Sequence, residues 1–260
     1  MVVKNSMPNE DLDTRQVYDK NSDLWLRLSP SSLSDYTARP FVFDACGNNL
    51  DGKSVLDIGC GEGYCARELK NRGAGDYLGI DLSSNMIEVA RLQEQQKPLG
   101  INYRQSNVVD FSAEQNYDIC IAVFLFNYLN ESDMTKTMSM VYRSLNIGGE
   151  FIFTIPHPFF PFMDHTHKAP FYFSSEGRNY FHDVNQQFQG EIWKRDGARL
   201  HVQCVHKTLQ SYFTSLAEAG FSSMPVIKEL TVTPEISQID PDFFSPLLNQ
   251  PLHILFKITK

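Results

Sequence analysis

The sequence predicts an α/β protein built on a doubly wound, mostly parallel sheet of seven strands. Over residues 53–156, short apolar runs typical of strands alternate with longer segments of helical period. The helical segments carry end signals, because the helix over 83–96 begins on serines and the helix over 63–73 closes on a glycine. Strands joined through helices make right-handed crossovers, so we expect a parallel sheet whose ligand site lies at the carboxyl ends of its strands.

The elements follow one another in a simple order. Each strand is an apolar run bounded by polar or turn-forming residues, and each helix has apolar residues at a spacing of three to four. The strands are predicted over 53–58, 76–81, 101–107, 117–126, 150–156, 222–232 and 252–259. The helices are predicted over 63–73, 83–96, 132–149 and 206–221. The third of these helices is expected to end at Gly148 and Gly149.

Size and composition favour a single domain. The chain has 260 residues, of which 42% are hydrophobic, so it can bury one substantial core. We expect one domain over residues 1–260 with two additions. These are a helical cap over 1–50 and an inserted lid over 157–206 that encloses the substrate.

Charge and cysteine usage restrict the partners. The formal net charge is −8 and no long block of Lys or Arg is present, which disfavours a nucleic-acid surface. The amino-terminal residues are too polar for a signal peptide, and the longest apolar run, 119–126, is too short to span a bilayer. The five cysteines form no C-x-x-C pair, which is typical of reduced thiols. We therefore expect a cytoplasmic protein whose partner is a small molecule, with no nucleic acid and no membrane.

A glycine-rich turn follows the first strand, in "VLDIGCGEG" over residues 55–63. Gly59 and Gly61 allow the backbone to turn tightly and to approach a ligand closely. A dinucleotide fingerprint would place a third glycine where this chain has Tyr64, and Asp57 would meet a pyrophosphate with a negative charge. Asp81 ends the second strand, 20 residues after Gly61, where a carboxylate can accept both hydroxyls of a ribose. The pattern predicts a nucleoside without a diphosphate.

At these residues the sequence resembles the class I S-adenosylmethionine-dependent methyltransferases, which have a Rossmann-like fold. Four motifs occur in the family's order, namely "VLDIGCGEG", "LGIDLSSNM", "NVVDF" and "YDICIAVFLFNYL". The last two strands, with the helix over 206–221, are similar to the family's ending, in which the last strand is antiparallel. The resemblance implies S-adenosylmethionine as the cofactor and S-adenosylhomocysteine as its product. It implies cofactor contacts from Tyr18, Arg39, Asp57, Gly59, Cys60, Gly61, Asp81, Leu82, Met86, Asn107, Val108, Val109, Asp110 and Phe124.

The family pattern suggests a role for most of these residues. The two loop glycines would lie under the methionine part of the cofactor, Asp57 would hold its amino group, and Asp81 would bind the ribose. Leu82 and Met86 would line the adenine, whose edge would be read around Val108, Val109 and Asp110. At position 107 this chain has Asn107, where many members carry an aspartate.

Four of these assignments have a structural alternative. Core packing is equally open for Tyr18 and Met86, and a helix cap for Asp110. Arg39, the candidate for the methionine carboxylate, could instead be a surface residue.

The segment over 157–206 would supply the substrate site. It holds six of the seven histidines and ten of the 32 aromatic residues, which suits a flat or conjugated small molecule or a cationic amine. Its second half is expected to form one or two hairpins, with Asp196 and Gly197 in one turn. The candidates for substrate contact are Tyr128, Tyr172, His182, Trp193 and His206, the last of which could be only a capping or lid contact.

His157 follows the fifth strand directly and is our candidate for a general base, because a neutral imidazole accepts a proton near pH 7. Asp164, His165 and His167 are metal-ligand types, but a fourth ligand at zinc-like spacing is missing, so we predict no metal.

The expected function is transfer of a methyl group to nitrogen or oxygen of a small, flat or aromatic metabolite, as in secondary metabolism. "LDIGCGEGYCARELKNRGA" and "IPHP" give a looser resemblance to methyltransferases of the toxoflavin pathway that act on nitrogen. Two alternatives stay open from the sequence. One is a regulatory protein that binds S-adenosylmethionine without catalysis, and the other is a nicotinamide-dependent oxidoreductase, which Tyr64 disfavours.

Overall fold

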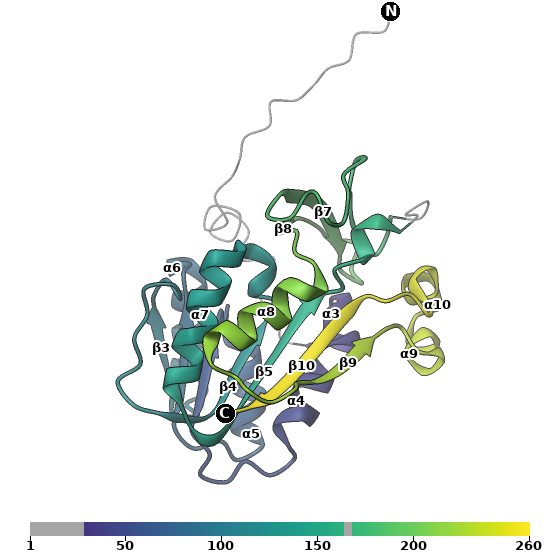
Figure 1. The fold of residues 1–260 in the computed structure, drawn as a ribbon. Helices are drawn as coiled ribbons and strands as arrows, with labels where there is room; N and C mark the ends of the chain where they lie inside the picture. The colour runs from purple at the N-terminus through teal and green to yellow at the C-terminus, as the bar shows by residue number, and fades with distance from the viewer. Residues whose placement is uncertain (1–28, 164–167) are drawn as a thin grey trace, which may run out of the picture.

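A seven-stranded sheet forms the centre of the computed structural model, which describes residues 29–163 and 168–260 (Figure 1). The strand order is β3-β2-β1-β4-β5-β10-β9. The strands are β1 (Val55–Ile58), β2 (Tyr77–Asp81), β3 (Ile101–Gln105), β4 (Tyr117–Val123), β5 (Leu145–Pro156), β9 (Val226–Leu230) and β10 (His253–Thr259). Neighbouring strands pair in parallel except at β10, which is antiparallel to both β5 and β9. The predicted doubly wound sheet is confirmed, including its antiparallel last strand.

Helices cover both faces of this sheet. Buried residues of α4 (Arg39–Cys46), α5 (Tyr64–Asn71) and α6 (Ser84–Gln96) pack against one face. Buried residues of α7 (Glu131–Ser144) and α8 (Leu209–Ala219) pack against the other face. The caps follow the sequence signals, because the hydroxyls of Ser83 and Thr208 accept the N–H of Met86 and Ser211 at 3.2 Å each.

The helix predicted to reach Gly149 ends earlier, at Ser144. Leu145 is already extended, and β5 begins there with an irregular register in which Tyr117 pairs with Leu145 and Ile119 with Glu150. A Cβ at Gly149 would lie within 3.2 Å of three backbone oxygens. Gly149 therefore serves a close backbone approach and Gly148 a φ of 78°, both in a strand irregularity and not at a helix end.

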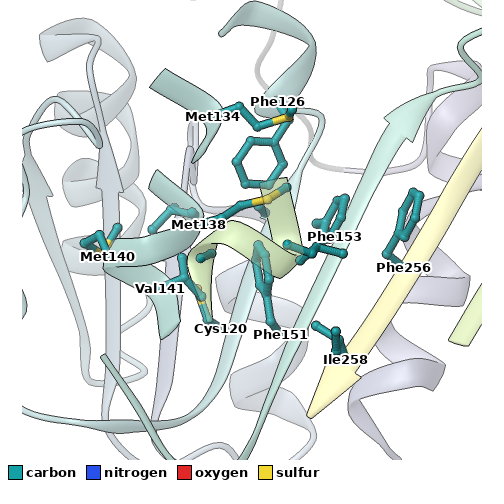
Figure 2. Packing of buried hydrophobic residues seen from close by; sticks show 14 of the residues in the cluster. Cys120, Phe126, Met134, Met138, Met140, Val141, Phe151, Phe153, Phe256 and Ile258 are labelled. Carbon is teal, nitrogen blue, oxygen red and sulfur yellow. The ribbon is translucent and has the colours of Figure 1, made fainter. Parts of the chain in front are cut away.

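The core beneath α7 and α8 is aromatic. Phe151 and Phe153 of β5 lie beside Phe256 of β10, and the rings of Phe153 and Phe256 stack at 4.6 Å (Figure 2). Met134 and Met138 of α7 fill the space above them. This packing fixes β5 and β10 against each other, and so it fixes the sheet edge at which β5 ends and β10 begins.

A second sheet is inserted between β5 and α8. It consists of β6 (Phe171–Phe173), β7 (Gln187–Trp193) and β8 (Arg199–Val205), all antiparallel, and it lies beyond the sheet end at which β10 begins (Figure 1). The predicted hairpin is present, with Gly197 at a φ of 85° in its turn. Phe188 and Phe173 belong to a separate apolar core under this sheet.

Contacts on two sides tie this inserted sheet to the main domain. At the start of α7, the Glu131 N–H donates to Asn185 Oδ1 at 2.8 Å, and Asn185 Nδ2 donates to Glu131 Oε2 at 3.2 Å. On the other side, Lys194 forms a β-bridge with Ser32, and Arg195 Nε donates to Asp240 Oδ2 at 3.0 Å. The inserted sheet is therefore attached to the start of α7 on one side and to Ser32 and Asp240 on the other.

Several short helices were not predicted individually from the sequence, although α3 falls within the helical cap expected over 1–50. They are α3 (Leu33–Thr37), α9 (Pro234–Ile239), α10 (Pro241–Phe244) and three 3₁₀ turns, η1 (Phe126–Tyr128), η2 (Phe160–Phe162) and η3 (Ser245–Leu247). The side chains of Thr233 and Asp240 cap α9 and α10, and a proline follows each cap. Within residues 29–163 and 168–260, every helix is too short or too polar to cross a membrane.

Truncation of the aromatic core tests this packing. We expect Phe153→Ala to lower the free energy of unfolding by about 3–5 kcal/mol, because Phe153 is fully buried and its removal leaves a cavity. Ile147→Ala is the control, since Ile147 is 89% exposed, and it should change stability by less than about 0.5 kcal/mol. Urea unfolding measures both. Equal losses in the two variants would contradict this description of the core.

Candidate active site

A cavity of about 350 Å³ lies where the parallel strands of the main sheet end. Its lining comes from the loop after β1, the end of β2, the segment after β4 and the first turns of α3 and α4. The inserted sheet contributes Ile192 from β7. Segments that lie far apart in the sequence therefore meet at the edge where a doubly wound sheet places its ligand.

The loop after β1 is bound to the end of β2. Gly59 and Cys60 donate their N–H groups to the carbonyl of Ile80, at 2.8 and 3.0 Å. The N–H of Gly61 donates to Asp81 Oδ2 at 2.9 Å. Gly61 has a φ of 55°, and a Cβ built on it would meet no atom within 4 Å, so the loop opens toward free space.

Asp81 uses both carboxylate oxygens to organise this end of the site. Oδ2 accepts from Gly61, and Oδ1 accepts the N–H of Ser83 at 2.9 Å. A carboxylate has about four acceptor positions, and these two backbone bonds fix how its oxygens are oriented at the cavity. The side chain is only half-buried and lines the cavity.

Asp57 is a buried carboxyl group on the same wall. Its side chain is fully enclosed, and Oδ2 accepts the hydroxyl of Tyr77 at 3.0 Å. Burial raises the pKa of Asp57 to about 7, against the bond from Tyr77, which lowers it. The carboxylates of Asp81 and Glu62 raise this pKa further, whereas Arg39 lowers it. The wall therefore favours a cationic group beside it.

Arg39 is the only cationic side chain among the described residues that line the cavity. It is 7% exposed, and Nη1 donates to Asp35 Oδ1 at 2.9 Å and to the hydroxyl of Ser34. Its guanidinium carbon lies 5.7 Å from the ring centroid of Phe124. Phe124 follows β4 with a φ of 58°, which is rare for a bulky residue and is found at functional sites.

The opposite end of the cavity is apolar. Leu82, the buried Met86 and the buried Val108 line it. Next to them, Asn107 forms an Asx turn, because Oδ1 accepts the N–H of Val109 at 3.1 Å and Nδ2 donates to Asp110 at 3.0 Å. A flat heterocycle fits such a slot, with polar backbone at its edge.

Comparison with known proteins finds a family match over part of the chain. A family model described as a methyltransferase domain matches residues 55–149, which contain the glycine loop, Asp81 and the segment after β4. This segment of the chain matches a class I methyltransferase domain. A phosphoethanolamine N-methyltransferase of Haemonchus contortus, with a TM-score of 0.57 at 19% identity over 85% of this chain and 52% of that one, is solved in complex with S-adenosyl-L-methionine. The match favours a methyltransferase over the oxidoreductase alternative.

Relatives and solved structures agree with this family. A candidate methyltransferase of Geobacillus sp. (strain WCH70) is 29% identical over 199 residues, which cover 69% of this chain and 78% of that protein. A ubiquinone biosynthesis O-methyltransferase of Acinetobacter baylyi is 40% identical over 89 residues, which cover 33% of this chain and 37% of that relative. An S-adenosylmethionine-dependent methyltransferase from Mesorhizobium loti has the same fold, with a TM-score of 0.63 at 22% identity over 85% of this chain and 96% of that one.

The residues of the cavity fit the cofactor by their chemistry. The cofactor joins an ammonium and a carboxylate to a ribonucleoside, and the cavity offers carboxylates in Asp57 and Asp81 and a guanidinium in Arg39. Most residues that the sequence assigned to the cofactor line this one cavity. They are Arg39, Asp57, Gly59, Cys60, Gly61, Asp81, Leu82, Met86, Asn107, Val108, Val109 and Phe124. Asp110 is exposed and does not line it, and Tyr18 lies outside the described residues.

His157, the predicted base, is not among the residues that line the cavity. Its Nδ1 accepts the N–H of Phe159 at 3.2 Å, so the neutral ring carries its proton on Nε2, which donates to Glu229 Oε1 at 3.0 Å. Both ring nitrogens are therefore engaged away from the cavity, and the role of His157 as a base stays a prediction.

The structure separates most of the predicted substrate residues from the cavity. Tyr128 lines it, whereas Tyr172, His182, Trp193 and His206 do not. His206 is 3% exposed, stacks on Phe188 and donates from Nε2 to the carbonyl of Tyr180 at 2.8 Å, so it is part of the insertion's core. His182 is exposed to solvent.

Alternation along β7 explains why Ile192 and not Trp193 faces the cavity. Successive side chains of a strand point to opposite faces of the sheet. Ile192 lines the cavity, whereas Trp193 packs against Tyr172, with ring centroids 6.0 Å apart. The sequence shows this alternation but not which face meets the main domain, and so Ile192 was missed.

Other lining residues were missed for different reasons. Glu62 lies inside the glycine motif but is fully buried, with an ion pair to Arg67 at 2.6 Å. Ser34 belongs to the unpredicted helix α3, and Asp133 lies in the first turn of α7. The sequence signal for Glu62 was its position in the loop, whereas Ser34 and Asp133 gave none.

The described residues include no group of three or more His, Cys, Asp or Glu side chains that could hold a metal ion. Asp164, His165 and His167, which were considered as ligand types, lie outside the described residues.

The raised pKa of Asp57 predicts a pH dependence of stability. An unfolded aspartate titrates near pH 4, so the folded protein binds this proton more tightly than the unfolded chain does. The stability from protonated Asp57 is fully present below about pH 4 and is lost as the pH rises through about 7. We expect the difference in unfolding free energy between wild type and Asp57→Asn to fall by about 1.4 kcal/mol per pH unit in that window.

Chemical denaturation between pH 4 and pH 8, without ligand, measures this difference. Asp57→Asn removes the ionisable group at nearly constant shape, so changes from other groups cancel in the subtraction. Parallel curves for the two proteins would show that Asp57 does not titrate in this range.

Proposed function

We propose that this methyltransferase transfers a methyl group to nitrogen or oxygen of a small, flat metabolite, with S-adenosylmethionine in the cavity at the strand ends. The observation that supports this most directly is the charge pattern of the cavity. Asp57 and Asp81 lie on one wall, and Arg39 is the single described cation facing them. This arrangement suits an amino acid joined to a nucleoside and suits few other ligands.

The amino-acid end of the cofactor would lie over the glycine loop. Asp57 would face the ammonium, which favours the ionised carboxylate, and Arg39 would face the carboxylate. Gly61 leaves open space where any other residue would place a Cβ. The ribose hydroxyls would donate to Asp81, whose bonds to Gly61 and Ser83 hold its oxygens in place.

The adenine would lie in the apolar slot beside Leu82, Met86 and Val108. These side chains offer a dry surface for a flat ring. The backbone around Val109 and the Asx turn of Asn107 would provide polar contacts at the ring edge.

The acceptor would bind next to Leu125, Tyr128, Leu129 and Ile192, which complete the cavity. This part is apolar and aromatic, with Asp133 as its charged group. An anionic polymer would find no counter-charge among these residues, so we infer a small neutral or cationic acceptor and no nucleic-acid substrate. We infer that residues 157–206 act as a lid, because Ile192 brings the insertion to the cavity.

S-adenosylmethionine supplies a methyl group that is already activated on a sulfonium. The chain's residues would therefore contribute alignment and exclusion of water more than bond chemistry. A neutral nitrogen acceptor needs no base before attack, whereas a hydroxyl acceptor benefits from one. The relatives named O-methyltransferases are compatible with oxygen, and the sequence resemblance to the toxoflavin-pathway enzymes is compatible with nitrogen.

We infer a reducing, cytoplasmic location. All five cysteines are buried and unpaired. Burial raises the pKa of the Cys60 thiol, whose side chain lines the cavity, and so keeps it protonated and unreactive.

Replacement of the ribose partner tests the position of the cofactor. We expect Asp81→Ala to weaken S-adenosylhomocysteine binding by about 10- to 100-fold, because bonds to a charged acceptor contribute about 1.5–3 kcal/mol each. Asp76→Ala is the matched control, since Asp76 is an exposed aspartate just before β2 and does not line the cavity. Titration calorimetry gives both constants. An Asp81→Ala protein that binds as tightly as the control would refute this placement.

A transfer assay tests the reaction itself. The protein is incubated with methyl-labelled S-adenosylmethionine and fractionated small molecules from a cell extract, and products are identified by mass. We expect a labelled product of low molecular mass whose yield falls strongly with Asp81→Ala at low donor concentration, because that variant binds the donor more weakly. Label found only in nucleic acid or protein would contradict a small acceptor. The fragment masses also assign the methyl group to nitrogen or oxygen.

A further inference from the structure

His253 is a buried histidine for which the described residues provide no hydrogen-bond partner. It is 3% exposed, and neither Nδ1 nor Nε2 makes a hydrogen bond of normal length and angle, although the backbone of Leu252 is close enough to raise the pKa of the ring. Burying two unpaired polar atoms is unfavourable, and phenylalanine would avoid that cost at similar size. A group of this kind calls for an explanation, and its position in the fold suggests one.

His253 begins β10 at the same sheet edge as the cofactor cavity. β10 is antiparallel, so His253 lies opposite Pro156, at the end of β5. The alternation of the strand places it on the face of Lys257, whose Nζ donates to the carbonyl of Ala45 in α4 at 2.8 Å. His253 is therefore directed to the side of the sheet covered by α4, the helix that begins with Arg39.

Phe124 connects His253 to the cavity. Its ring centroid lies 5.0 Å from that of His253 in an edge-to-face arrangement, and 5.7 Å from the guanidinium carbon of Arg39. Phe124 itself lines the cavity, and its N–H donates to the carbonyl of Thr154 at 3.0 Å, which holds its unusual backbone conformation. His253 and Arg39 thus pack on one ring.

Arg39 and Thr154, which both contact Phe124, also carry buried polar atoms without described partners. Arg39 Nε carries a buried N–H with no described acceptor, and Thr154 Oγ1 is buried without a described partner. Burial and the nearby charge of Arg39 lower the pKa of His253 to about 3. The imidazole is therefore neutral near pH 7, and a neutral imidazole has one acceptor nitrogen.

We propose that His253 is a positioning residue for the cofactor site, whose imidazole accepts the Nε–H of Arg39 when the cofactor is bound. This bond fixes the plane of the guanidinium, while Asp35 holds Nη1. The remaining N–H groups of the terminal fork then face the carboxylate of the cofactor. The inference rests on the proposed function, because it takes Arg39 as the carboxylate's partner.

Two ligands separate this role from a structural one. S-adenosylhomocysteine has the amino-acid carboxylate, whereas 5′-methylthioadenosine has the same nucleoside without it. We expect His253→Phe to weaken binding of the first by about tenfold and of the second by less than about twofold, since one bond to a charged group is lost. His253→Gln keeps a polar acceptor and should restore most of the affinity for S-adenosylhomocysteine. Titration calorimetry provides all constants, and thermal melting checks that each variant is folded.

Arg39→Met distinguishes failure of this inference from failure of the proposed site. It should lose affinity for S-adenosylhomocysteine selectively, and if it does not, the placement of the carboxylate is wrong. If Arg39→Met is selective but His253→Phe binds like wild type, or weakens both ligands equally, the positioning role is overturned. A His253→Gln protein as weak as His253→Phe would overturn it as well.

Discussion

The hydrogen bond from the Gly61 N–H to Asp81 joins the two strands on which the whole site depends. It links the turn after β1 to the end of β2 at 2.9 Å. Glycine at a φ of 55° lets the backbone adopt this turn, and the carboxylate holds it open toward the cavity. The same carboxylate orders Ser83 and hence the start of α6. The Asp81 side chain thus fixes the conformation of the glycine loop before any ligand binds. The same hydrogen bonds fix the orientation of its own carboxylate.

The charged side chains that line this preformed site determine which ligand charges it favours. Carboxyl groups dominate the wall beside the loop, and their proximity contributes to keeping Asp57 partly protonated near neutral pH. A cationic ligand relieves that repulsion, so binding energy and the ionisation of Asp57 are linked. Arg39 would provide the positive charge that the carboxylate of the ligand's amino-acid end needs. A ligand with separated ammonium and carboxylate groups satisfies both, whereas a pyrophosphate would satisfy only Arg39.

The sequence predicted the sheet and most of the cofactor cavity because both depend on local patterns. Alternating strand and helix signals place β1 to β5 in order, and the interval from Gly61 to Asp81 spans the helix and second strand of one βαβ unit. What it could not predict depends on contacts between distant segments. Ile192 and Trp193 are equally apolar neighbours, and only docking of the inserted sheet decides which one faces the cavity. His253 looked like the first residue of an ordinary strand.

The histidines also show how far residue type alone can identify a functional side chain. His157 and His206 drew attention because imidazoles often handle protons, yet their ring nitrogens are taken by Glu229, by the backbone of Phe159 and by that of Tyr180. His253, outside the histidine-rich segment, is the buried histidine whose nitrogens lack hydrogen-bond partners among the described residues. The residue type therefore indicates a functional role less well than the hydrogen bonds that each histidine makes in the fold.

A crystal structure of the protein with S-adenosylhomocysteine tests the central claim most directly. The account predicts the ribose hydroxyls on Asp81, the amino-acid end over Gly59 and Gly61, and the carboxylate at Arg39. Electron density for the ligand elsewhere, or a reversed ligand with its adenine over the glycine loop, would contradict it.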